Sequence, residues 1–170
     1  MGILSGNPKD EPMHYGEVYS TWMHLSVNNG LIAAYQTFIN HIGDEDLKKL
    51  VQEAIDAMKG ENSQIEELLK ENGIALPPAP PERPVANLED IPPGAKFSDP
   101  EISAAVSKDV AEGLVACSTV IGQVIREDIG AMYGQFHMAK AQFGFKMLKL
   151  NKSKGWLIPP PLQVKSTEKT

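Results

Sequence analysis

Residues 74–98 read IALPPAPPERPVANLEDIPPGAKFS, and this stretch decides how the rest of the chain can fold. Eight of the 13 prolines lie between Pro77 and Pro100, whereas none occurs in residues 13–76 or 101–158. Because proline lacks a backbone N–H and breaks helix interiors, the proline-free regions can form long helices and the stretch between them cannot. The sequence therefore predicts two helical regions joined by an extended connection.

Each proline-free region holds two expected helices. In residues 44–72, apolar side chains recur at spacings of three and four, as in Leu47, Val51 and Ile55, which is typical of an amphipathic helix. We place the helices at about 14–41, 44–72, 99–126 and 128–154, with a tail at 155–170, in one domain spanning 1–170. No stretch alternates as a strand does, so the expected class is all-α. One long bent helix in place of the last two is the alternative near Asp128.

The length of the connection at 73–98 predicts the topology. Helices of about 26 residues are ~39 Å long, and roughly 13 residues in polyproline geometry span that distance. The connection can therefore return the chain along the whole bundle, which makes the second and third helices parallel. We predict a ferritin-like four-helix bundle, whose topology has one long crossover. A disordered linker is the alternative, and Pro78–Pro81 fits weakly the pattern of a proline-rich ligand for another protein.

Composition and charge exclude several classes of protein. The chain has 170 residues, a net charge of -6 and a sequence pI near 5.2, which argues against nucleic-acid binding. No apolar run is long enough to cross a membrane, and the single Cys117 excludes an internal disulfide framework. The first ten residues, MGILSGNPKD, lack the features of a secretory signal, so we expect cytoplasmic synthesis.

Two features suggest self-association. The helix expected at 14–41 has one apolar set containing Trp22 and Leu25 and a second containing Val27 and Phe38. A helix that is apolar on more than one face is usually buried on more than one face, so we expect a homodimer, with burial under the proline segment as the alternative. Residues 129–170 carry seven lysines and one acid, which would suit head-to-tail electrostatic assembly or simply complement a helix end.

Three stretches resemble a known family: NGLIAAYQTFINHIGDEDL at 29–47, ENGIALPPAPPERP at 71–84, and REDIGAMYGQFHMAKAQFGFKMLKLNKSKGWLIPPPL at 126–162. They are similar to ferritin-like helical proteins of spore-forming Gram-positive bacteria that are assigned to the spore coat, relatives of spore coat protein F without an established activity. The resemblance covers residues 15–162. It implies a structural, coat-associated protein, with other coat proteins as partners, and a packing role for Trp156 near the end of the bundle.

Metal-binding motifs are sparse. Di-iron bundle proteins use Glu-x-x-His pairs on two helices, but the only such pair here is Glu11–His14, beside a proline. The assumed topology instead brings candidate ligands for zinc or iron to one layer: His24, Glu112, Cys117 and His137. Glu61 is expected at the same height, and its alternative position is facing solvent. In the alternative reading, Cys117 is a small buried apolar residue and the histidines belong to the core. We expect no cofactor.

Polar residues also interrupt the helix expected at 14–41. Asn28, Asn29 and Gly30 are poor helix formers, and they would either make buried hydrogen bonds that fix helix register or line a small-ligand pocket. The chain has no Gly-rich phosphate loop and no Gly-x-Ser-x-Gly motif. The sequence therefore favours a structural or interaction protein without enzymatic activity, and the alternative is a metal- or small-ligand-binding bundle.

Overall fold

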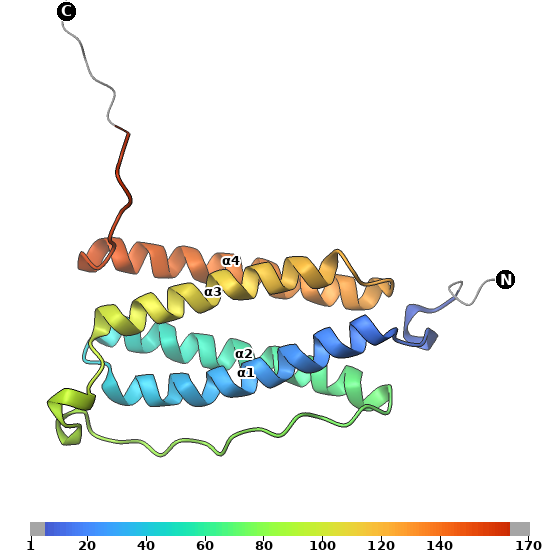
Figure 1. Cartoon of the computed structure of the whole chain (residues 1–170), viewed down its shortest axis with the longest axis horizontal. Helices are drawn as coiled ribbons and strands as arrows, with labels where there is room; N and C mark the ends of the chain where they lie inside the picture. The colour runs from blue at the N-terminus through green and yellow to red at the C-terminus, as the bar shows by residue number, and fades with distance from the viewer. Residues whose placement is uncertain (1–5, 164–170) are drawn as a thin grey trace, which may run out of the picture.

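In the computed structural model, which describes residues 6–163, four α-helices form two hairpins that lie against each other (Figure 1). The first hairpin consists of α1 (Tyr15–His41) and α2 (Glu45–Glu71), and the second of α3 (Asp99–Ile121) and α4 (Glu127–Lys154). No strand occurs within residues 6–163. The predicted all-α class is confirmed.

The helix ends follow from local capping. The Asp44 carboxylate accepts the backbone N–H groups of Asp46 and Leu47, each at 3.0 Å, as expected of an acidic N-cap. Ser98 and Glu101 form a capping box at the start of α3. Gly155 ends α4 with a φ of 72°, in the left-handed region that glycine adopts without strain.

The predicted end of the third helix was wrong, whereas the predicted start of the fourth helix lies within one residue of the observed one. Helix α3 ends at Ile121 rather than at residue 126, and α4 begins at Glu127. A loop at 122–126 separates them, so the alternative of one bent helix does not apply. The apolar pattern continues through Val124 and Ile125, but the backbone N–H of Ile125 bonds to the carboxylate of Glu17 on α1 instead of continuing a helix.

The proline-rich crossover, residues 73–98, runs beside the first hairpin from the end of α2 to the start of α3, which makes α2 and α3 parallel (Figure 1). Side chains of α1 hold it. Asn40 donates to the carbonyl of Pro84 and accepts from the N–H of Ala86, both at 3.0 Å, and Gln36 accepts from the N–H of Arg83 at 2.9 Å. The predicted long crossover is therefore confirmed, with two short 3-10 turns at Leu88–Asp90 and Pro93–Ala95.

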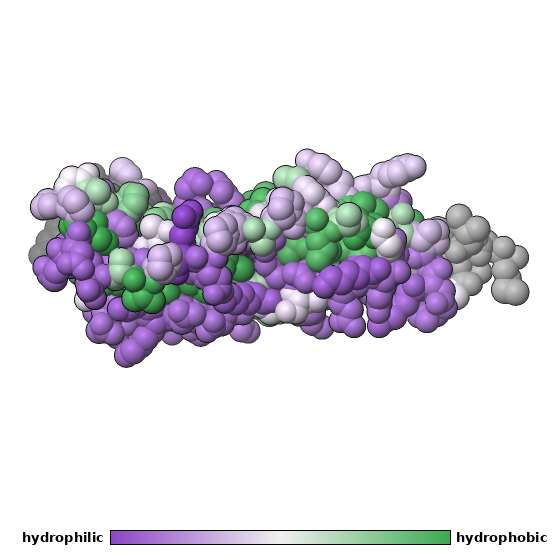
Figure 2. Space-filling view, turned by 90° about the horizontal axis from the view of Figure 1, so that it is seen from below, coloured by the Kyte–Doolittle hydropathy of each residue, from purple (hydrophilic) through white to green (hydrophobic). Residues whose placement is uncertain are grey.

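The crossover contacts both apolar sets of α1, the first through Trp22 and the second through Phe38. The indole N–H of Trp22 donates to the carbonyl of Ala75 at 3.0 Å, and Phe38 packs edge-on against Phe97. Tyr19 nevertheless remains 67% exposed. Seen from below, the molecule shows apolar atoms in separate patches among hydrophilic ones (Figure 2).

Two apolar clusters fill the bundle. One gathers around Tyr35, Leu47 and Ile102 and includes the half-buried Trp156, so Trp156 has the packing position that the resemblance implied. The other gathers around Leu25 and Leu69, and its remaining members include Ile65, Cys117, Tyr133 and Phe136. None of the helices in the described part of the chain is long and apolar enough to cross a membrane.

Candidate functional site

A cavity of about 570 Å³ lies between the two hairpins and is lined by residues of all four helices. Exposed residues such as Tyr19, Glu53 and Ala116 belong to its lining, so it opens to solvent. Most of its wall is apolar and includes Met23, Leu31, Ala54, Met58, Val110 and Phe143. A partly open apolar cavity of this size is typical of a binding site.

The polar part of the wall is organised around Glu61 of α2, which is only 6% exposed. One carboxylate oxygen lies 3.0 Å from Nε2 of His24 and accepts from Nδ2 of Asn28, also at 3.0 Å. The other accepts from Nζ of Lys140 on α4. Two helices, α1 and α4, therefore supply partners to one carboxylate of α2.

These partners determine the charge state of Glu61. Burial alone would raise the pKa of this carboxyl, but the hydrogen bond with His24 and the charge of Lys140 outweigh it, so the pKa lies below its usual range. Glu61 is therefore ionised at neutral pH and paired with the Lys140 ammonium. A paired charge offers little to a free cation or anion, so the apolar walls dominate what the cavity can bind.

A second polar pair lies at another part of the cavity wall. The Tyr35 hydroxyl donates to the Asp109 carboxylate at 3.1 Å, which joins α1 to α3. Burial raises the pKa of Asp109 although the bond from Tyr35 opposes the rise. This bond and the Glu61–Lys140 pair are cross-links between the hairpins rather than exposed reactive groups.

Behind His24 the wall is aromatic and buried. The Tyr133 ring stands edge-on to His24 with 5.3 Å between ring centroids, and within the described residues its buried hydroxyl has no hydrogen-bond partner. Cys117 is fully buried in the same cluster, and burial raises the pKa of its thiol to about 11. A thiol in that state is a poor nucleophile.

The structure does not gather the four candidate metal ligands. His24 is engaged by Glu61, Glu112 is exposed and pairs with Lys108 at 2.7 Å, and Cys117 is buried in the apolar cluster, while His137 is half-buried on α4. Across residues 6–163, no three His, Cys, Asp or Glu side chains form a group that could hold a metal.

The sequence analysis placed Glu61 at the height of His24, but it did not identify Glu61 as the residue that organises the polar part of the cavity wall. Lys140 carried a usable signal, because it is the only charged residue between Ile129 and Phe145. A lone lysine on an apolar helix face needs a partner when it is buried. The asparagines make the buried hydrogen bonds expected of them, since Asn28 donates to Asn62 and Asn62 donates to Asn29. Asn28 also belongs to the lining of the cavity, as the pocket alternative expected.

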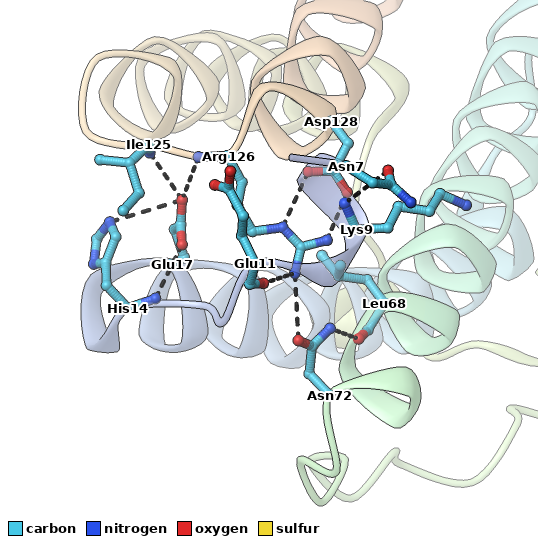
Figure 3. A network of polar contacts seen from close by, with 10 residues as sticks. All are labelled: Asn7, Lys9, Glu11, His14, Glu17, Leu68, Asn72, Ile125, Arg126 and Asp128. Carbon is cyan, nitrogen blue, oxygen red and sulfur yellow. Dashed lines mark hydrogen bonds and ion pairs between the residues drawn. The ribbon is translucent and has the colours of Figure 1, made fainter. Parts of the chain in front are cut away.

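A second network, which sequence reasoning missed, closes one end of the bundle (Figure 3). The Arg126 side chain, only 1% exposed, donates twice to the Asp128 carboxylate, at 3.0 and 2.6 Å. It also donates to the carbonyl of Glu11 and to the side chain of Asn72. With its donors directed at these partners, Arg126 joins the N-terminal segment, α2 and the loop before α4.

The fold and this cavity define an all-helical bundle protein with one long crossover and a largely apolar cavity between its hairpins, without an activated nucleophile in the described residues. The chain belongs to a family of proteins of unknown function, DUF3231, which matches residues 1–168. The resemblance seen in the three quoted stretches is thereby confirmed at the level of the family.

Two relatives extend this result. The uncharacterised protein YvdQ of Bacillus subtilis strain 168 is 57% identical over 164 residues, which cover 96% of each chain. A crystal structure of a protein from Bacillus halodurans C-125, provisionally named a spore coat protein, superimposes with a TM-score of 0.93 at 69% identity. The match covers 94% of this chain and 100% of the other.

Proposed function

We propose that the protein is a structural component associated with the spore coat that acts by binding other copies and other coat proteins, without catalysis. The observation that carries this proposal is the 69% identity to the protein provisionally named for the spore coat. At that identity, the surfaces by which two bundles make contacts are expected to be largely shared. The paired charges of the cavity and the buried thiol of Cys117 in the second apolar cluster support a role without chemistry.

The outer surface of the second hairpin supports self-association into a homodimer. Val115 on α3 and Met138 and Phe145 on α4 are 67%, 61% and 65% exposed. The sequence from 113 to 125 contains no charged residue. Exposed apolar side chains are typical of a protein interface, and the uncharged stretch 113–125 adds no charge repulsion between two copies of a chain of net charge -6.

Localisation in sporulating cells tests the coat assignment. A fluorescent fusion would be expressed in Bacillus subtilis lacking YvdQ, and spores would be fractionated by detergent and alkaline extraction of the coat. We expect the fusion to surround the developing spore and to leave with the coat fraction. A fusion that stays dispersed in the mother cell and is absent from purified spores would refute the coat assignment.

Small-ligand binding is the second candidate function, and the cavity favours it because its volume falls within the range of small-molecule sites. Native mass spectrometry of protein purified without denaturation distinguishes the two. A co-purifying molecule of constant mass that is released on unfolding would support ligand binding. Only the mass of the polypeptide would favour the structural role.

A further inference from the structure

The chain that follows α4 leaves the bundle with apolar side chains exposed. From Gly155 the segment extends away from the helices (Figure 1). Ile158 is 92% exposed, Leu162 is 76% exposed and Leu157 is 38% exposed. Since three large apolar residues on one extended segment are costly to leave in water, this segment is a candidate contact surface.

The segment is also stiff. Pro159, Pro160 and Pro161 fix φ at three consecutive residues and favour the polyproline conformation. A segment held extended in this way does not fold back within a few residues onto its own bundle. It also loses little conformational entropy on binding, because most of its backbone freedom is already absent.

The cavity between the hairpins fits such a segment in length and in chemistry. Its lining along α1 runs from Tyr19 to Tyr35, about 24 Å at 1.5 Å per residue. Residues 157–162, which follow the packed Trp156, span about 19 Å in polyproline geometry and fit within this length. Tyr19, Tyr35 and Phe143 belong to the lining, and aromatic-lined grooves are the usual receptors for proline-rich segments.

Charge complements this fit. The cavity lining contains four carboxylates and two lysines: Glu53, Glu61, Asp109 and Glu112, with Lys140 and Lys146. The apolar segment 155–162 itself has no charged residue, and it is flanked in the sequence by Lys149 and Lys152 before it and by Lys165 and Lys169 after it. Three of these carboxylates are already paired, Glu61 with Lys140, Glu53 with Lys146 and Glu112 with Lys108. Charge therefore adds a weak attraction for a basic-flanked segment, and the apolar contact carries the fit.

We propose that the segment 157–162 of one copy binds in the cavity of a second copy. This inference rests on the proposed function, and it adds a second contact, between segment and cavity, to the homodimer surface of the second hairpin. The contact joins two different surfaces, so each copy offers one free segment and one free cavity. Such head-to-tail contacts build rings or open chains rather than closed two-fold dimers.

Complementary variants of the full-length protein test the contact by sedimentation velocity across a range of concentrations. The segment variant is Ile158→Ser with Leu162→Ser. The cavity variant is Ala116→Trp, which places an indole in the lining at an exposed helical position. Matched controls are Val85→Ser, at an exposed position of the crossover, and Ala104→Trp, at an exposed position of α3 outside the lining.

We expect wild type and both controls to form species larger than a dimer and each test variant to associate at least tenfold more weakly. Mixing the two test variants should restore one contact per pair of molecules. The cavity variant still has an intact segment, and this segment can bind in the intact cavity of the segment variant. Association of either variant at the wild-type concentration, failure of the mixture to pair, or a wild type that stays monomeric or dimeric would overturn the proposal. Coat localisation is measured separately, so a wild type that reaches the coat but forms nothing larger than a dimer would refute this contact alone.

Discussion

The carboxylate of Glu17, in the first turn of α1, accepts the backbone N–H groups of Ile125 and Arg126 at 2.8 and 3.0 Å, across 108 and 109 positions of the chain. Its other oxygen accepts the N–H of His14 at 3.0 Å (Figure 3). Glu17 is 1% exposed. One buried side chain therefore holds the start of the first helix against the loop between the last two.

Replacing Glu17 with Ala should destabilise the fold by about 3 kcal/mol, because two buried backbone N–H groups would lose their acceptor. Glu17→Gln keeps one oxygen in place and should cost less. Urea unfolding at neutral pH measures both changes. An unfolding midpoint of Glu17→Ala equal to that of wild type would show that the loop does not depend on this contact.

The protein should lose stability in acid, partly through Asp128. The bonds from Arg126 hold the pKa of the Asp128 carboxyl below its usual range. A carboxyl with a lowered folded pKa stabilises the fold above its unfolded pKa, and this stabilisation disappears as the pH falls through the folded value. We expect the free energy of unfolding of wild type to decrease as the pH is lowered below about 4. In Asp128→Asn this decrease should be smaller, because the titrating carboxyl is absent. Equal falls in both proteins would contradict the assignment.

Asn40 should protect the crossover from proteolysis. It both donates to and accepts from the crossover backbone, so Asn40→Ala should speed cleavage after Glu82 or Glu89 by a glutamate-specific protease several-fold. Asn40→Asp, which keeps the acceptor, is the matched control. Cleavage of wild type as fast as that of Asn40→Ala would indicate that these bonds do not hold the segment.

Cys117 should be inert in the folded protein. Its burial and the rise in its pKa to about 11 leave little accessible thiolate at neutral pH. A chromogenic disulfide reagent should therefore label less than one hundredth as fast in buffer as in denaturant, an order-of-magnitude expectation from the thiolate's role as nucleophile. Rapid labelling of the native protein would show that the second apolar cluster opens.

Purified protein should contain no stoichiometric zinc or iron. Lys140 neutralises the Glu61 carboxylate beside His24, and a metal would have to displace it. Elemental analysis of protein made without a metal-binding tag provides the measurement. One zinc or iron per chain, lost on mutation of His24 to Ala, would instead support the metal-binding alternative.

The sequence predicted the topology because proline and helix periodicity act locally. Prolines between Pro77 and Pro100 exclude a helix there, and the length of that segment leaves one way to connect the hairpins. The error at the end of α3 has a long-range cause, since Glu17 binds the N–H groups that would otherwise continue the helix. No spacing rule reveals a contact across more than one hundred residues.

The residues of the candidate site were less predictable than the topology, because their positions depend on how each helix is rotated about its axis. The layer containing His24 was correctly placed near Glu61, but the rotation of α3 about its axis was not determined by periodicity alone. That rotation exposes Glu112 and buries Cys117. A helix carrying exposed apolar residues such as Val115 beside buried ones has no single apolar stripe from which its orientation can be read.

The crossover has a consequence for how the chain is made. The α-helical residues that hold it by hydrogen bonds, among them Trp22, Gln36, Asn40 and Lys59, lie on α1 or α2. A ribosome therefore completes all of them before it reaches residue 75. The emerging crossover can dock onto a finished first hairpin and carry the growing chain to the end where α3 must start. Synthesis from the N-terminus thus favours the parallel arrangement of α2 and α3 before the second hairpin exists.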